Sequence, residues 1–243
     1  MENTNRGNLK ISGAGSGTGG SYEEVRISGA GSIDGDIDCR LLKISGAGEV
    51  NGNVKAEDIR ISGTGDIKGN IECDNIQVSG ACEVKGDVQS KSIRISGGSD
   101  FKGGLKADQI EISGAIEVKG DCEAESFTAS GAFEIGGLLN ADNIDIRMKG
   151  YCSVAEIGGE KISIREGEEF FNLVRMISSV FSTRQGMKCS IIEGDDIYLE
   201  DTRAKIVRGN NVTIGKGCEI ELLEYRNEIN IYDDRCVKET KKV

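Results

Sequence analysis

The hydrophobic positions of this chain recur every 17 residues. From Ile27 to Asp145 seven consecutive units keep this spacing; residues 44–60 read ISGAGEVNGNVKAEDIR and residues 78–94 read VSGACEVKGDVQSKSIR. Apolar residues stand at positions 1, 7, 11 and 16 of the unit, and a small residue stands at position 13. Positions 16 and 1, like positions 11 and 13, are two apart, which is the period of a strand with one buried face. Each unit therefore predicts three short β-strands.

Glycine occupies positions 3 and 9 of every unit. It predicts corners at which the backbone has a positive φ or closely approaches another segment. This pattern does not fit the 3.6-residue period of a helix. Because a single unit cannot bury its own apolar side chains, the units must stack on one another. We predict an all-β fold, a parallel right-handed β-helix that rises by about 4.8 Å per coil.

Charged residues also keep to fixed positions. Position 6 is acidic from Glu49 to Glu134, and position 8 is lysine at residues 68, 85, 102 and 119. The two columns lie two residues apart, so we expect a solvated ladder of alternating sign that contributes little stability per pair. Cation binding by the acidic column is the alternative.

The repeat weakens after Ile146 and is then interrupted. Apolar residues between Gly167 and Arg184 recur three and four apart, which predicts an amphipathic helix with Glu168 and Glu169 in its first turn. We expect this helix to pack on the solenoid; docking to a partner or to a membrane surface is the alternative. The strand pattern returns at residues 196–199, 212–214 and 229–231. The predicted segments are regular β-helix at 1–163, a helical segment at 164–187, irregular coils at 188–237 and a charged tail at 238–243.

The composition argues against several function classes. The net charge of −11 disfavours nucleic acid as a partner, and the sequence has no histidine to serve as a general base or metal ligand. We therefore expect no enzyme activity, no cofactor and no metal. The eight cysteines form no C-x-x-C pair and the start of the sequence is polar, which together predict reduced, buried thiols in a cytoplasmic protein.

The 17-residue repeat, with its fixed apolar and glycine positions, resembles that of the bactofilin family of bacterial cytoskeletal proteins. The resemblance rests on runs such as Val84-Lys85-Gly86-Asp87-Val88 and residues 50–56, VNGNVKA, each followed by I-x-I/V-S-G. It implies a right-handed, three-sided β-helix that polymerises end to end without nucleotide. It also implies roles in cell shape, motility or envelope organisation, with membrane association and with envelope proteins or other family members as further partners.

Self-assembly has a physical basis as well, because the end coils of an open solenoid carry backbone groups without partners. The candidate contacts for self-assembly or partner binding are the apolar residues of the two end coils and of the amphipathic segment: Ile11, Val25, Ile27, Phe170, Phe171, Val174, Ile177, Phe181, Tyr225, Ile229 and Ile231. A cytosolic β-solenoid that binds partners without polymerising is the alternative function. An acyltransferase solenoid is disfavoured, because the hexapeptide-like run at residues 214–220 stands alone.

Overall fold

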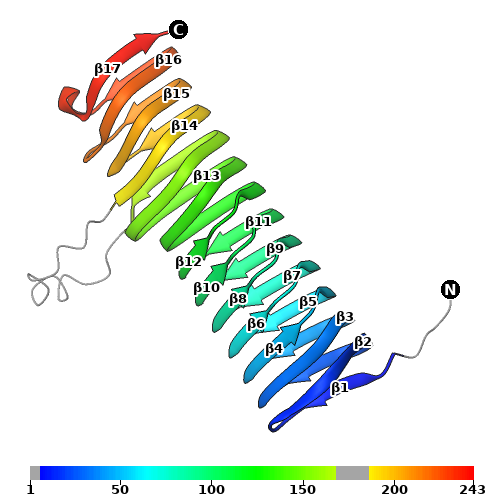
Figure 1. The fold of residues 1–243 in the computed structure, drawn as a ribbon. Helices are drawn as coiled ribbons and strands as arrows, with labels where there is room; N and C mark the ends of the chain where they lie inside the picture. Colours follow the sequence, from blue (N-terminus) through cyan, green and yellow to red (C-terminus); the bar gives the residue numbers. More distant parts are fainter. Residues whose placement is uncertain (1–5, 168–185) are drawn as a thin grey trace, which may run out of the picture. The chain divides into compact units, whose positions relative to one another are not determined.

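The computed structural model describes residues 6–167 and 186–243, and it confirms the all-β parallel solenoid. The chain divides into two compact units, residues 1–121 and 122–243. The first contains twelve strands: β1 Asn8–Ile11, β2 Gly15–Ile27, β3 Ala30–Ile44, β4 Ala47–Asn51, β5 Val54–Ile61, β6 Thr64–Ile67, β7 Ile71–Val78, β8 Ala81–Val84, β9 Val88–Ile95, β10 Gly98–Phe101, β11 Leu105–Ile112 and β12 Ala115–Val118. Figure 1 shows these strands stacked coil upon coil.

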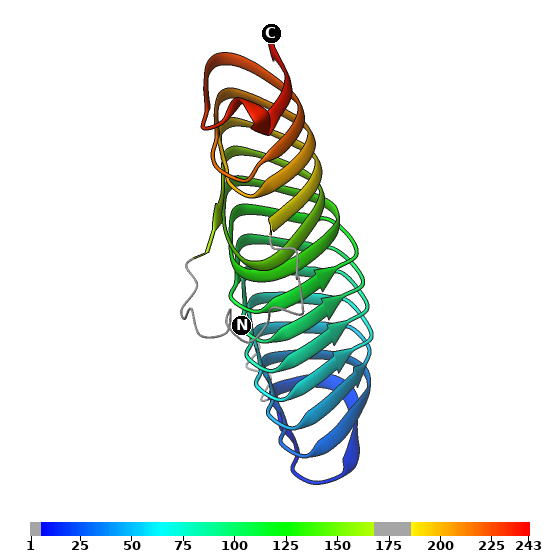
Figure 2. The same ribbon diagram turned by 90° about the vertical axis from the view of Figure 1, so that its left-hand side faces the viewer.

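The second unit contains the remaining elements: β13 Cys122–Glu166, β14 Gly186–Leu199, β15 Thr202–Ile214, β16 Glu219–Ile231, the short 3₁₀ turn Asp234–Cys236 and β17 Val237–Lys242. In Figure 2 the ribbon of this unit winds around a central axis in closed coils. The described residues contain no α-helix. The amphipathic helix predicted for residues 168–184 lies outside the described residues.

The register in the first unit follows the repeat. Strands β5, β7 and β9 pair in parallel so that Val54, Ile71 and Val88 stand on top of one another, each 17 residues from the next. The second unit departs from this spacing: Ile197 stands on Ile162, Val212 on Ile197 and Ile229 on Val212. The buried side chains of successive coils therefore stay aligned, although the number of residues per coil varies.

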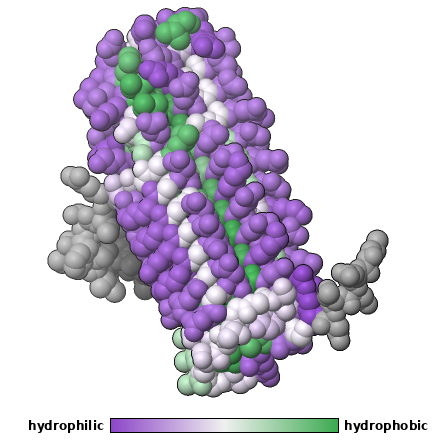
Figure 3. All heavy atoms as spheres, turned by 45° about the vertical axis from the view of Figure 1, so that its right-hand side comes forward, coloured by the Kyte–Doolittle hydropathy of each residue, from purple (hydrophilic) through white to green (hydrophobic). Residues whose placement is uncertain are grey.

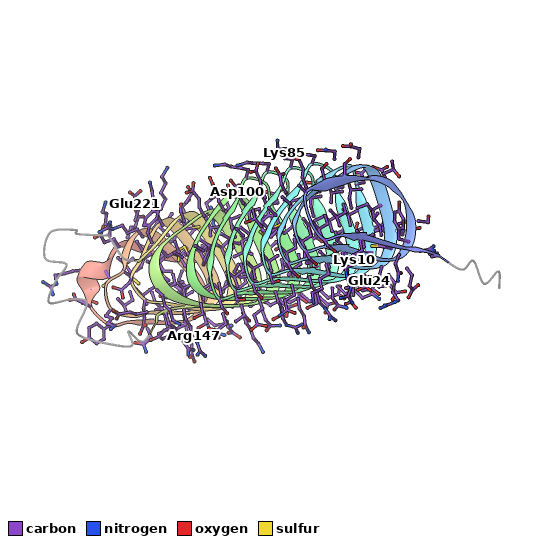
Figure 4. The ribbon with its side chains drawn as sticks, turned by 90° about the horizontal axis from the view of Figure 1, so that it is seen from below. Lys10, Glu24, Lys85, Asp100, Arg147 and Glu221 are labelled. Atoms are coloured by element: carbon purple, nitrogen blue, oxygen red, sulfur yellow. The ribbon has the colours of Figure 1, made fainter. Side chains whose placement is uncertain are left out.

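The core consists of the repeat's apolar columns. Ile44, Val50 and Ile67 are completely buried, and Val54 and Ile59 are each 1% exposed. Figure 4 shows the interior filled with side chains, while charged side chains such as Lys85 and Asp100 point outward. Each coil buries its apolar side chains only against neighbouring coils, which makes stacking the main source of stability.

The corner glycines are explained by close approach of the coils. A Cβ on Gly52 would lie 2.5 Å from the carbonyl oxygen of Gly35, and a Cβ on Gly69 would lie 2.5 Å from that of Gly52. Positive φ angles among the described glycines occur only at Gly20, Gly35, Gly186 and Gly217. Of the two reasons predicted for the glycine columns, close approach therefore applies to most positions.

Asparagine and aspartate stack next to one of these glycine columns and join successive coils. The backbone N–H of Asn70 donates to Asn53 Oδ1 at 2.9 Å, and that of Asp87 donates to Asn70 Oδ1 at 2.9 Å. The backbone N–H of Asn53 donates in the same way to Asp36 Oδ1 at 2.7 Å. These side chains hold the turn of the next coil, so the column is a structural one.

The predicted charge ladder is present on the first unit. Lys102 Nζ lies 2.5 Å from Asp100, and Lys68 forms an ion pair with Asp66 and a second one, at 3.5 Å, with Glu49 of the preceding coil. The hydrogen bond from Lys68 to Asp66 raises the pKa of the lysine above its usual value. These side chains are about one-third exposed or more, so each pair contributes little to stability.

Residues 238–243 differ from the charged tail that the sequence suggests. Most of them belong to β17, which pairs in parallel with β16 from Ile220↔Val237 to Tyr225↔Lys242. Lysine is well suited to an edge strand, because its charge discourages unwanted pairing, and a charged sequence is therefore compatible with a strand at this place.

Candidate functional site

The end of the first unit that begins with β1 is covered by two side chains. Gly17 stands beside Ile33, and Gly20 stands beside Ile37, so two inward columns lose their side chains in this coil. Leu9 occupies the space over Gly17, with Cδ2 3.0 Å from where a Cβ would lie, and the Tyr22 ring lies 3.6 Å from that position on Gly20. The Tyr22 hydroxyl donates to the Thr18 carbonyl oxygen at 2.8 Å and fixes the ring.

The backbone of this first coil remains an open edge. β1 pairs with β2 from Asn8↔Glu24 to Ile11↔Ile27, and no strand of the described residues lies beyond it. Residues 11–21 carry no charge. Figure 3 shows pale and hydrophobic atoms at this end, where β1 and β2 lie. β1 itself contains the exposed Lys10, whereas residues 11–21 form an uncharged stretch of the kind that accepts another strand.

The last coil of the second unit is only half covered. β17 pairs with residues 220–225 of β16, while the other half of β16, from Arg226 to Ile231, has no strand on its outer edge within the described residues. Ile229 and Ile231 continue the inward columns of Val212 and Ile214, which are 2% and 0% exposed. Without a further coil above them both isoleucines are partly exposed, and Tyr232 beside them is 77% exposed.

The two parts of this last coil carry opposite charge. β17 contains Lys238, Lys241 and Lys242 against Glu239, a net charge of +2. Residues 226–235 contain two arginines against Glu228, Asp233 and Asp234, a net charge of −1. Asp233 is held by Arg235, whose hydrogen bonds lower the pKa of that carboxyl to about 2. The last coil thus has a basic strand over its covered half and a slightly acidic segment along its open half.

The predicted contact residues differ in how exposed they are in the structure. Val25 and Ile27 are completely buried and Ile11 is 8% exposed, so these three lie inside the first unit. Ile229, Ile231 and Tyr225 are partly exposed on the last coil. The five predicted contacts between Phe170 and Phe181 lie outside the described residues. Leu9, Tyr22 and Tyr232 also lie at the solenoid ends, and they were not among the contacts predicted from the sequence. The lack of side chains at Gly17 and Gly20 is the sequence feature that points to Leu9 and Tyr22.

Titratable groups show no sign of a catalytic arrangement in the described part of the chain. No group of three or more His, Cys, Asp or Glu side chains there could hold a metal ion. All eight cysteines are buried, and burial raises the pKa of the Cys82 and Cys218 thiols to about 12. Such thiols are poor nucleophiles. No helix among the described residues is long and apolar enough to cross a membrane.

Comparisons with known proteins identify relatives of this chain. A family model described as "Bactofilin: Polymer-forming cytoskeletal" matches residues 3–89. The uncharacterized protein YhbE of Bacillus subtilis (strain 168) is 55% identical over 221 residues, covering 90% of this chain and 91% of the relative. The uncharacterized protein YhbF of the same organism is 36% identical over 91 residues, covering 37% of this chain and 34% of that relative. No solved structure matches.

Proposed function

The chain belongs to the bactofilin family, which is polymer-forming and cytoskeletal, and we propose that it acts as a scaffold by polymerising through its solenoid ends without a nucleotide. The family and the β-solenoid fold support a cytoskeletal scaffold. The proposal adds the contact surfaces and the source of the assembly free energy, which is backbone pairing and apolar burial between end coils.

The half-covered last coil is the observation that carries this proposal. Ile229 and Ile231 stand at the top of two inward columns whose lower members are buried, so a coil from another copy would bury them in the same way. The unpaired edge of residues 226–231 supplies backbone groups for the same contact. Opposite charges on β17 and on residues 226–235 set the orientation in which two copies meet.

The open edge at β1 supplies the second contact that a polymer needs. Its uncharged residues 11–21 present backbone groups, while Leu9 and Tyr22 shield the apolar columns beneath. Pairing there relies more on backbone hydrogen bonds than on apolar burial. We therefore expect this contact to be the weaker one, so that assembly proceeds through pairs joined at the last coil.

Sedimentation of two matched variants tests the proposal. Ile229→Lys places a charge in the apolar column of the last coil, whereas Asn230→Lys places the same charge on the neighbouring exposed position. We expect wild type and Asn230→Lys to pellet at high speed without added nucleotide, and Ile229→Lys to stay in the supernatant. Equal pelleting of both variants would show that the last coil is not a contact.

The shielding of the β1 end also favours a second candidate function, a scaffold that forms no polymer. In that case contacts through the last coil alone stop at pairs, and the wild type stays in the supernatant as a dimer. For either function we expect a cytoplasmic location and roles in cell shape, motility or envelope organisation. Envelope proteins and other bactofilins are the further partners we propose, together with association at the membrane surface.

A further inference from the structure

An exposed aliphatic stripe crosses three coils of the second unit. Ile191, Ile206 and Leu222 stand on top of one another in β14, β15 and β16, and all three are partly exposed. Leu138, also of this unit, is 40% exposed. Figure 3 shows hydrophobic atoms gathered in this part of the molecule on a mostly hydrophilic surface. The most exposed large hydrophobic residues of the described chain, Leu138, Tyr151, Tyr232 and Val243, all belong to the second unit.

A hollow with a glycine floor lies directly beside the stripe. It has a volume of about 500 Å³, and its lining includes Gly159, Gly194 and Gly209 together with Ile191 and Leu138. Gly194 stands on Gly159 and Gly209 on Gly194, so three glycines of successive coils line the hollow. The lining also contains the charged residues Glu193, Arg208 and Glu224, so the hollow adjoins a charged flank of the stripe.

Two rows of alternating charge flank the stripe. On one side Glu193, Arg208, Glu224 and Lys241 stand on successive coils, with Arg208 Nε 2.7 Å from Glu224 and Lys241 Nζ 3.1 Å from Glu224. On the other side Lys205, Glu221 and Lys238 are all exposed, and Lys238 lies 4.0 Å from Glu221. Figure 4 shows Glu221 pointing away from the coils.

We propose that this surface binds a second copy of the chain side by side, with the two coil stacks antiparallel and the twofold axis between β15 and β16. This inference deepens the proposed scaffold function, since it adds a lateral contact to the contacts at the ends. Ile206 then faces Leu222 of the second copy. Arg208 faces its Glu224, Lys205 faces its Glu221, and Glu193 faces its Lys241, so all of these charges meet opposite charges.

A parallel arrangement is disfavoured by the same residues. A twofold axis along the coil stack brings each flank of the stripe against the other flank of the second copy at the same level. Arg208 then faces Lys205, Glu224 faces Glu221 and Lys241 faces Lys238, so that each contact joins like charges. Like charges in an interface are strongly unfavourable, and the charge pattern therefore selects the antiparallel pair.

Charge variants of Lys205 and Glu221 test the proposal in a chain whose last-coil contact, the stronger of the two proposed end contacts, is removed by Ile229→Lys. Sedimentation velocity of the Ile229→Lys chain should show dimers. Adding Lys205→Glu or Glu221→Lys should weaken dimerisation about tenfold or more, because each variant brings like charges together. An equimolar mixture of the two double variants should restore the dimer. In the mixed pair, the Lys205→Glu position of one copy faces the Glu221→Lys position of the other, so these two charges are opposite. The native Glu221 of the first copy faces the native Lys205 of the second, which is also a pair of opposite charges.

Opposite results would overturn the antiparallel pair. An Ile229→Lys chain that stays monomeric at the highest concentrations removes the lateral contact altogether. A Lys205→Glu variant that strengthens dimerisation indicates the parallel arrangement, in which residue 205 faces Arg208. Lys205 and Glu221 are exposed, so their substitution should leave the fold intact, which circular dichroism checks. Wild type that forms these dimers but no end-to-end polymer would reject the proposed polymerisation and leave this inference standing.

Discussion

The carbonyl oxygen of Gly80 occupies the place where a Cβ on Gly97 would stand. The two glycines belong to one corner column, and the contact brings neighbouring coils together at a distance that excludes any side chain. Gly98, the next residue, has no atom within 4 Å of its own Cβ position. Two adjacent glycines of one corner therefore have different roles.

This difference predicts opposite effects of two neighbouring substitutions. Gly97→Ala should destabilise the chain by about 3 kcal/mol, since the methyl group must push two coil backbones apart. Gly98→Ala should be neutral or stabilising by about 0.5 kcal/mol, because φ is not positive there and alanine restricts the unfolded chain. Urea unfolding followed by circular dichroism measures both. Equal losses for the two variants would contradict the close-approach explanation.

A second prediction concerns the side chains that join successive turns. Asn70 Oδ1 accepts the backbone N–H of Asp87, so Asn70→Ala should lower the free energy of unfolding by about 1 kcal/mol. Asn70→Asp keeps an acceptor, as Asp36 and Asp87 do at equivalent places, and should retain most of that stability. Urea unfolding of both variants gives the comparison; a loss as large for aspartate as for alanine would exclude this hydrogen bond as the cause.

Much of the first unit could be predicted from the sequence because its period stays at 17. Columns such as Val54, Ile71 and Val88 follow directly from counting, and the structure confirms their register. The covering of Gly17 and Gly20 by Leu9 and Tyr22 could not be predicted in this way. It depends on side chains folding over a coil edge, and a glycine-rich stretch by itself indicates only a lack of bulk.

The second unit was less predictable for a related reason. Its coils change length, and the stripe of Ile191, Ile206 and Leu222 becomes visible only after the register is known. The charged residues 238–243 gave no apolar alternation that would indicate a strand, and pairing with β16 decides their conformation. Local sequence pattern predicts strands best where one face is buried.

A third prediction concerns Asp201. Within the described ranges 6–167 and 186–243 it is the one non-glycine residue with a positive φ, 43°. Burial, followed by the charge of Glu166, raises the pKa of its carboxyl. The folded state therefore favours the protonated form, and ionisation at neutral pH is destabilising. Asp201→Asn should raise the melting temperature at pH 7, because asparagine tolerates this φ and carries no charge.

The pH dependence separates the charge effect from the backbone effect. The advantage of Asp201→Asn should be full above the raised folded pKa of Asp201. It should shrink as the pH falls through that value, and the charge contribution should vanish below the unfolded pKa of about 3.9. Melting curves of both proteins between pH 3 and 7 measure this. An advantage that grows at low pH would contradict the direction of the pKa shift.

The buried thiols give a fourth prediction. Burial raises the pKa of Cys39 and Cys189 to about 12, so few thiolates exist at neutral pH. All eight cysteines should react with a thiol reagent in urea, and their reaction in the native protein should be slower by about a hundredfold or more, since it requires opening of the coils. Rapid reaction of one or more native thiols would show that the coils containing them open readily.

Electron microscopy of the purified wild-type chain in negative stain, without nucleotide and over a range of concentrations, tests the central claim most directly. The half-covered last coil and the open β1 edge predict filaments that appear above a threshold concentration and that Ile229→Lys abolishes. Particles that remain single at every concentration, or filaments that form equally well with Ile229→Lys, would contradict assembly through the solenoid ends.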